Sequence, residues 1–209
     1  MSRAPAAMLA LSALVSTSTS GAESNDARYF ALTESATWTY EYRFRVEGQF
    51  SMEQVGKTVN WIDGIVERGG HQYYRMRTKT TGFQNAPSGE VFIRIAEDSL
   101  RAIEPERDPT EKEVLSLPLP AIPGSTWSIG EGAETWHYTL ESIEPVEVPA
   151  GRFEDCIAIV FTLESKTSEF EISARKEHCA GVGMVRHRTK AVSEHGTSYG
   201  EYTLLEHKP

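Results

Sequence analysis

Residues 38–46 read Trp-Thr-Tyr-Glu-Tyr-Arg-Phe-Arg-Val, an unbroken alternation of apolar and polar side chains. Successive side chains in a β-strand point to opposite faces, so a strict period of two is typical of a strand with one buried and one solvated face. The buried face would carry Trp38, Tyr40, Tyr42, Phe44 and Val46. The segment therefore predicts a sheet with a strongly aromatic face that another part of the chain has to cover.

Similar alternating runs follow this segment along the chain. They predict strands at Tyr73–Thr80, Val91–Ile95, Trp136–Ile143, Asp155–Leu163, Gly183–Val192 and Ser198–Leu205. Weaker strand signals lie at Phe50–Val59, Leu100–Ile103 and Trp127–Ile129. Glycine-containing turn signals separate the runs, such as Glu47-Gly48 and His195-Gly196, at the spacing that an antiparallel meander requires.

Convincing helical periodicity is missing from the chain after its N-terminal segment. The polar stretch Glu104–Glu113 has room for one helical turn, but Pro105 and Pro109 limit it. Without helices, the aromatic face is most economically buried by another part of the same sheet. We therefore expect an all-β fold with little helix, in which an antiparallel curved sheet of about ten strands forms a half-barrel or barrel.

The N-terminal segment has the anatomy of a secretory signal peptide. It carries one positive charge at Arg3, an apolar stretch over Ala6–Val15 and a small-residue tract that ends at Ala22. The apolar stretch is too short to span about 30 Å of hydrocarbon, and no other run approaches the roughly 20 residues of a transmembrane helix. We expect a signal peptide at residues 1–22, a single β-rich domain at residues 23–209, and periplasmic or extracellular localisation without a membrane span.

The charge of the chain bears on its partners. The formal net charge is −9, and it becomes −10 once Arg3 is removed with the signal peptide. An acidic balance repels phosphate backbones and anionic lipid surfaces. We therefore expect no nucleic acid partner.

The two cysteines, Cys156 and Cys179, both lie in the mature chain, and an even count in an exported protein favours a disulfide over two free thiols. A tight turn at residues 166–169 would pair strand residues whose numbers sum to 335, which places the two sulfurs opposite each other. Cross-strand Cβ atoms about 4.5 to 5.5 Å apart come close to the separation that a disulfide needs. The same register places Glu164 opposite Glu171, an unfavourable pair of like charges.

Motifs for catalysis and metal binding are missing from the sequence. No Gly-x-Ser-x-Gly elbow is present, and bridged cysteines would leave no thiol nucleophile. The six histidines show none of the close spacings that aim two imidazoles at one ion, and His137 and His187 are interpreted as solvated side chains on strand faces. We expect no metal, cofactor or enzymatic activity. A hydrolase would need two acids meeting across a cleft, which the sequence does not locate.

Basic side chains recur at alternate strand positions. They are Arg43 and Arg45, then Arg75, Arg77 and Lys79, then Arg186, Arg188 and Lys190. We interpret them as partners of cross-strand acids such as Glu41 and Glu201 on the solvated exterior. A patch for an acidic partner is the alternative.

The aromatic side chains form the candidate binding site. The residues expected to face a ligand are Trp38, Tyr40, Tyr42, Phe44, Tyr74, Trp136 and Tyr138. Aromatics with polar tips suit a cavity that holds a lipid or similar apolar molecule and hydrogen-bonds its polar end. The alternative is that these side chains fill the interior completely, as they do in small barrels.

Two motifs carry a resemblance to a known family. Residues 148–153 read Val-Pro-Ala-Gly-Arg-Phe, and residues 181–185 read Gly-Val-Gly-Met-Val. Over Pro145–Val185 the chain resembles a bacterial family of exported proteins of unknown function, which is similar to the periplasmic lipoprotein-localisation factors. The resemblance implies a curved antiparallel sheet around a hydrophobic cavity, and the family has no agreed catalytic residues. His178-Cys179 replaces the tyrosine or tryptophan that usually precedes the second motif.

These observations lead to two functional hypotheses. The first is an exported, non-enzymatic binding protein for a hydrophobic small molecule, a lipid or a lipidated protein, acting as a carrier or chaperone-like factor of the cell envelope. The second is a structural or adaptor protein that docks on another envelope component through its sheet surface. The sequence leaves the ligand and the oligomeric state open.

Overall fold

Twelve β-strands follow a short 3-10 helix, η1 (Asn25–Tyr29), in the computed structural model, which describes residues 25–83, 88–105, 112–130 and 133–209. The strands are β1 (Thr37–Gly48), β2 (Met52–Arg68), β3 (His71–Thr81), β4 (Ser88–Ile95), β5 (Ser99–Ile103), β6 (Val114–Pro118), β7 (Thr126–Ile129), β8 (Glu134–Val148), β9 (Gly151–Ser165), β10 (Glu171–Cys179), β11 (Gly183–Ser193) and β12 (Gly196–Lys208). The signal peptide predicted for residues 1–22 lies outside the described residues.

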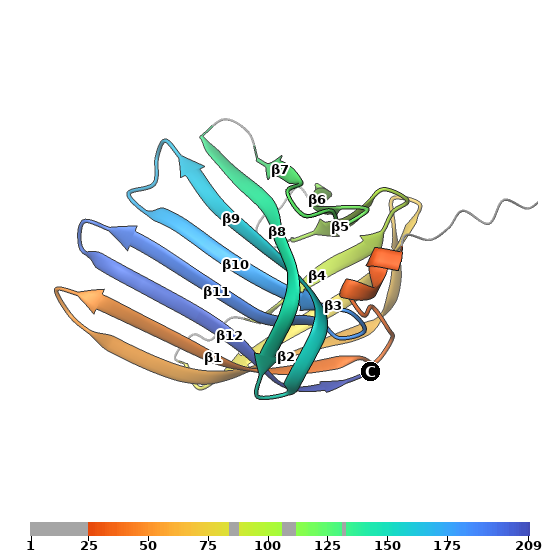
Figure 1. Ribbon diagram of the computed structural model, residues 1–209, viewed down its shortest axis with the longest axis horizontal. Coiled ribbons are helices and arrows are strands. Elements are labelled where there is room, and N and C mark those ends of the chain that lie inside the picture. The colour runs from red at the N-terminus through yellow and green to blue at the C-terminus, as the bar shows by residue number, and fades with distance from the viewer. Residues whose placement is uncertain (1–24, 84–87, 106–111, 131–132) are drawn as a thin grey trace, which may run out of the picture.

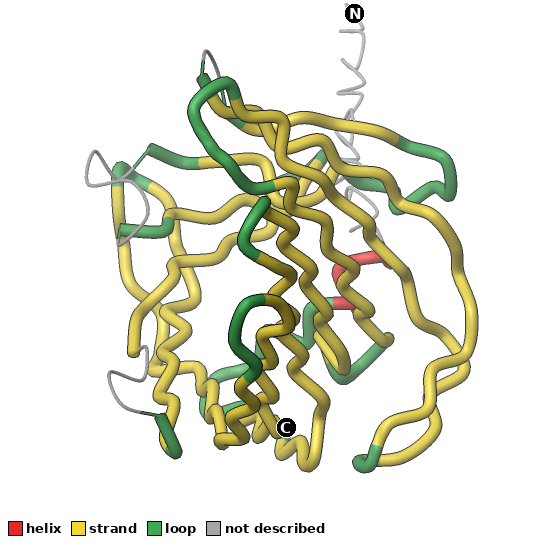
Figure 2. The backbone as a smooth tube through the Cα atoms, turned by 90° about the vertical axis from the view of Figure 1, so that its left-hand side faces the viewer, coloured by secondary structure: helices red, strands yellow, loops and turns green. Residues whose placement is uncertain are grey.

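All twelve strands belong to one antiparallel sheet, in the order β6-β5-β4-β3-β2-β1-β12-β11-β10-β9-β8-β7. Except for β6 and β7, strands that follow one another in the chain are neighbours, and β1 pairs with β12. The outermost strands, β6 and β7, are not hydrogen-bonded to each other. Figure 1 and Figure 2 show the sheet curling round on itself, which gives a nearly closed barrel.

The predicted all-β class and the scarcity of helix are confirmed, but the sheet has twelve strands rather than about ten. Strand β6 is absent from the prediction because its alternation covers only five residues and ends at Pro118. Strand β2 continues to Arg68, past the predicted limit at Val59. A bulge between Ile62 and Ile65 lets the strand pass through Gly64, whose φ of 90° is readily adopted only by glycine.

One end of the barrel, which we call the closed end, holds a buried cluster. Because the strands are antiparallel, the starts of odd-numbered strands and the ends of even-numbered strands meet there. The cluster consists of Ala36, Trp38, Tyr40, Ile62, Val146, Val148, Cys156, Cys179, Val185 and Leu204. The β8–β9 hairpin reaches β12 at this end, where the Ala150 amide donates to the Leu204 carbonyl (3.1 Å). We call the opposite end, with the β1–β2, β9–β10 and β11–β12 turns, the rim.

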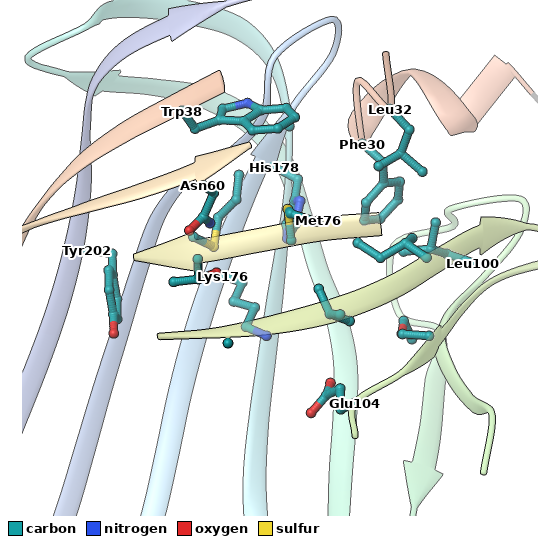
Figure 3. A pocket seen from close by; sticks show the side chains of 18 of the residues that line it. Phe30, Leu32, Trp38, Asn60, Met76, Leu100, Glu104, Lys176, His178 and Tyr202 are labelled. Atoms are coloured by element: carbon teal, nitrogen blue, oxygen red, sulfur yellow. The ribbon is translucent and has the colours of Figure 1, made fainter. Parts of the chain in front are cut away.

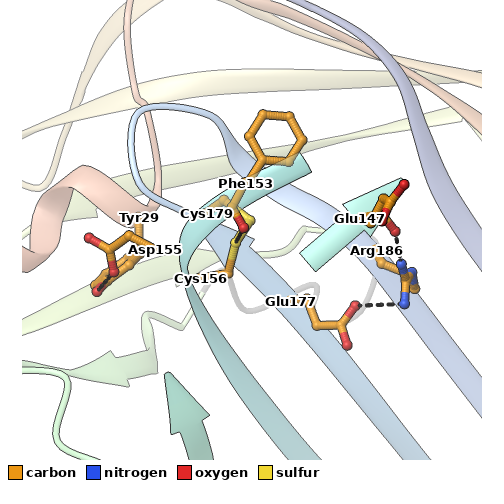
Figure 4. The surroundings of a disulfide bond; sticks show 8 residues. All are labelled: Tyr29, Glu147, Phe153, Asp155, Cys156, Glu177, Cys179 and Arg186. Atoms are coloured by element: carbon orange, nitrogen blue, oxygen red, sulfur yellow. Dashed lines mark hydrogen bonds and ion pairs between the residues drawn. A yellow bond between two sulfur atoms is a disulfide. The ribbon is translucent and has the colours of Figure 1, made fainter. Parts of the chain in front are cut away.

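Cys156 on β9 and Cys179 on β10 form a disulfide at the closed end (Figure 4). The two strands pair in the predicted register, with Cys156 opposite Cys179, so the predicted bridge is confirmed. The β9–β10 pairing begins with Leu163 opposite Ile172, so Glu164 and Glu171, which were expected to oppose each other, lie just beyond the paired residues. Both half-cystines are 0 % exposed, which makes the bond part of the core.

Basic side chains on the outer faces of the strands pair with acids. Asp63 contacts Arg75 at 2.7 Å and Arg77 at 3.0 Å. Glu177, whose side chain is 5 % exposed, contacts three arginines at 3.0 to 3.4 Å: Arg175, Arg186 and Arg188. Figure 4 shows Arg186 between Glu177 and Glu147. The interpretation of these basic residues as partners of neighbouring acids is confirmed for the arginines named here.

The disulfide leads to a prediction about stability. The bond closes a loop with a sequence separation of 23 residues, and in the chain-entropy description such a crosslink stabilises the folded state by about 3 kcal/mol. We expect the Cys156→Ala/Cys179→Ala double variant, and the wild-type protein reduced in urea, to unfold at clearly lower urea concentration than the oxidised protein. Equal urea midpoints for the three forms would contradict a stabilising bond.

Candidate ligand-binding cavity

The interior of the barrel contains a cavity of about 510 Å³ (Figure 3). Its apolar wall near the closed end includes Phe30, Trp38, Met76, Ile93 and Leu100. Toward the rim the lining changes to small side chains on β3–β6: Thr78, Thr80, Ser88, Gly89, Ala102 and Ser116. The cavity is thus lined by bulky apolar side chains near the closed end and by small side chains toward the rim.

Two aromatic side chains of β1 reach over the neighbouring strand β12 and are fixed by hydrogen bonds to backbone carbonyls near the start of β11. The Trp38 indole N–H donates to Val182, and the Tyr40 hydroxyl donates to Met184 at 2.8 Å. Burial raises the pKa of Tyr40 well above its ordinary value, so this hydroxyl stays a donor. The alternation read from the sequence places both rings inside the barrel, and the hydrogen bonds hold them at the cavity wall.

A second, smaller cavity of about 280 Å³ adjoins the first. Both cavities are lined by Glu104, Ser116, Tyr138 and Lys176. The remaining lining of the smaller cavity is largely aromatic and includes Trp136, Phe161 and His187. The shared residues mark a junction between an apolar chamber and an aromatic one.

A row of stacked rings crosses the inner face of the sheet from β1 to β7. Ring centroids lie 4.2 Å apart for Tyr42 and Tyr202, and 5.9 Å apart for Tyr202 and His187. The row continues from His187 to Phe161 (6.0 Å), Tyr138 (5.0 Å) and Trp127 (5.2 Å). At the β1 end, Phe83 lies 5.1 Å from Tyr42 over Gly56, where a Cβ would come within 2.3 Å of the Phe83 ring.

Of the seven residues predicted to face a ligand, four line a cavity in the structure and three do not. Trp38, Tyr40 and Tyr138 line the larger cavity, and Trp136 and Tyr138 line the smaller one. The other three predicted residues line neither cavity: Tyr42 stacks on Tyr202, Tyr74 packs against the closed-end cluster, and Phe44 is half-buried farther along β1.

Three polar residues of the interior were missed by the sequence reasoning: Lys176 and His178 on β10, and His187 on β11. The interpretation of His187 as a solvated side chain is wrong, because it pairs with Lys176 on one side and Tyr202 on the other, both of which line the cavity. Strand β10 alternates Ile, Ala, Lys and His on its inner face. Only the first two are apolar, so the period of two does not reveal which face is inside.

Both interior imidazoles are neutral at ordinary pH. Burial, together with the smaller effect of the Lys176 charge, lowers the pKa of His178 to about 3 and that of His187 to about 3. Within the described residues, His178 Nδ1 and His187 Nε2 have no hydrogen-bond partner. The Lys176 ammonium lies 5.3 Å from the centre of the Phe161 ring, a cation–π distance. Polar groups therefore cluster at the junction of the two cavities.

His137 and Asp155 serve local contacts. His137, on the outer face of β8, bonds Ser128 and Glu164 at 3.0 Å each. Asp155 accepts a hydrogen bond from the Tyr29 hydroxyl at 2.7 Å, which ties η1 to β9.

Across residues 25–83, 88–105, 112–130 and 133–209, no three His, Cys, Asp or Glu side chains lie close enough together to form a metal site. In the same ranges, no helix is long and apolar enough to cross a membrane.

Together these features define a class: an all-β protein whose nearly closed barrel surrounds a mainly apolar cavity. The chain is similar in structure to an exported protein with a YmcC-like fold from Bacteroides fragilis (TM-score 0.52) and to a lipoprotein from Parabacteroides distasonis (TM-score 0.50). In both comparisons 13 % of residues are identical, and the match covers 86 % of this chain and 98 % of the other. No family model and no curated protein matches the sequence. At this identity the likeness shows a shared fold.

The lowered histidine pKa values predict a pH dependence. Because the unfolded chain takes up these protons below about pH 6.5 and the folded chain does not, stability falls as pH drops. Between pH 7 and pH 5 we expect the wild-type protein to lose about 1 to 2 kcal/mol more unfolding free energy than the His187→Gln variant. Urea unfolding at the two pH values measures the difference.

The matched control for this experiment is His195→Gln, because the His195 side chain is 66 % exposed in the β11–β12 turn. It should follow the wild-type protein. If His187→Gln also follows the wild-type protein, the lowered pKa of His187 is refuted.

Proposed function

We propose that this protein is an exported, non-enzymatic binding protein that holds an apolar ligand, such as a lipid or the acyl chain of a lipidated protein, inside its barrel. The observation that carries the proposal is the cavity of about 510 Å³ beside Trp38 and Tyr40. Its volume falls within the range of about 300 to 1,000 Å³ that is usual for small-molecule sites. Its apolar wall suits a hydrocarbon chain, since burial of apolar surface drives such binding.

Export is supported by two independent observations. A buried disulfide joins β9 and β10, and disulfides persist in oxidising compartments such as the periplasm and the cell exterior. The two proteins of similar fold are described as an exported protein and a lipoprotein. A carrier or chaperone-like role in the cell envelope, in the periplasm or outside the cell, is consistent with both.

The adaptor hypothesis receives less support from the outer surface. It calls for docking through an exposed sheet edge or through a basic strand face that would be available to an acidic partner. The arginines of that face instead contact acids of the same chain, as Arg75 and Arg77 contact Asp63. Exposed ion pairs of this kind leave little free charge for a partner. Interior binding is therefore the function that we favour.

A substitution that fills the cavity tests the proposal. Thr78 lines the cavity and lies opposite Gly89, which leaves space for a larger side chain, and the next residue, Lys79, is exposed. The probe is N-phenyl-1-naphthylamine, an uncharged apolar fluorophore, added to protein unfolded in urea and refolded to remove co-purified lipid. We expect Thr78→Phe to weaken binding roughly tenfold or more, because the ring occupies the site, while Lys79→Phe binds as the wild-type protein does.

Native mass spectrometry of protein purified without unfolding gives a second measurement. We expect a bound lipid-sized mass on the wild-type protein and on Lys79→Phe, and its loss from Thr78→Phe. The proposal fails if the wild-type protein binds neither the fluorophore nor a lipid, or if both variants lose binding equally.

A further inference from the structure

We infer that the ligand is a single-chain amphiphile whose anionic head group, a carboxylate or a phosphate, binds at Lys176. The inference rests on the proposed function and names the chemical class of the ligand. It starts from the position of Lys176, which lines both cavities and extends into the interior from the middle of β10 (Figure 3). A group bound there lies where the two chambers meet.

The polar groups around Lys176 form a niche in an otherwise apolar wall. His187 lies directly opposite Lys176 on β11, and His178 lies two residues along β10 on the same face. Both imidazoles are neutral, and His178 lines the larger cavity while His187 lines the smaller one. A ring nitrogen of His178 hydrogen-bonds the backbone of Tyr29, so the imidazole that can donate its one N–H to an anionic oxygen is that of His187.

The charge expected on the head group follows from the positions of the charged residues around the cavity. Besides Lys176, the charged residues of the lining are Glu90 and Glu104, and Glu90 lies opposite Arg77, whose side chain is on the outer face. Both belong to the rim side of the cavity, since Glu90 is near the start of β4 and Glu104 follows the last residue of β5. Lys176 lies deeper, between Ile159 on β9 and His187 on β11. Lys176 is the only cation among the described residues that line the two cavities, so it is the group that would hold an anion there.

The orientation of the ligand follows from the two chambers. Toward the closed end the lining is apolar, with Trp38, Met76, Ile93 and Leu100, and it suits the hydrocarbon chain. The aromatic chamber beyond Lys176 opens in the direction of the rim, where Glu104 and Ser116 lie. The chain would therefore point to the closed end, with the head group at the junction.

The test compares ligands that share a chain and differ in the head group. Dodecanoate, dodecyl phosphate and dodecanol are titrated against the wild-type protein by displacement of N-phenyl-1-naphthylamine. We expect dodecanoate or dodecyl phosphate to bind roughly tenfold or more tightly than dodecanol, because a charge-assisted hydrogen bond contributes about 1.5 to 3 kcal/mol. The tighter of the two anions distinguishes a carboxylate from a phosphate head group.

Two variants with opposite expected effects make the test specific. Lys176→Gln should abolish the preference for the anions over dodecanol, and a cooperative urea unfolding transition shows that the variant is folded. Glu104→Gln should strengthen the binding of the anions, because it removes a negative charge from the same junction. The matched control is Lys190→Gln, an exposed lysine on neighbouring β11, which should leave all affinities unchanged.

The outcomes separate this inference from the proposed function. If the fluorophore binds but the anions have no advantage over dodecanol, or if Lys190→Gln reduces anion binding as much as Lys176→Gln, the head-group site is refuted and the apolar cavity stands. If the fluorophore and all three amphiphiles fail to bind, the proposed function fails as well.

Discussion

The aromatic face of β1 has to be kept from water, and this constraint shapes the rest of the fold. Within the described residues the only helix is η1, which is five residues long, so no helical layer is present to cover the sheet. The sheet meets the constraint by curling until β1 faces strands from the far part of the chain. Trp38 and Tyr40 donate hydrogen bonds over the neighbouring strand β12 to Val182 and Met184, so both rings are held on the inner face near the start of β11.

The barrel that results has a closed end and a hollow middle, and the difference arises from side-chain size. At the closed end, the disulfide, Val185 and Leu204 pack around Trp38 and are all nearly inaccessible. Farther along, β3–β6 present threonine, serine, glycine and alanine toward the same interior. Larger apolar residues at these positions would bury more surface and stabilise the fold. Their smallness keeps a space open that stability alone does not favour.

The sequence predicts this structure where alternation is pure and misses it where the inner face is mixed. On β1 every second residue is aromatic or apolar, so the buried face can be assigned, and the cysteine spacing predicts the β9–β10 register. On β10 the inner positions include Lys176 and His178, whose polarity suggests the opposite face. The cavity cannot be predicted from a single sequence, because it depends on which small side chains lie opposite which aromatic rings in the folded barrel.

The polar residues that the sequence reasoning missed also carry a cost in stability. A buried imidazole without a hydrogen-bond partner destabilises a protein by about 1 to 3 kcal/mol, and a lysine inside an apolar cavity adds a further desolvation cost. His178 Nδ1 and His187 Nε2 are such atoms, and both belong to residues of the Lys176 niche. Aliphatic residues at these positions would remove the cost. Lys176 places a positive charge between an apolar chamber and an aromatic one, which is the arrangement that a ligand with an anionic head group and a hydrocarbon chain requires.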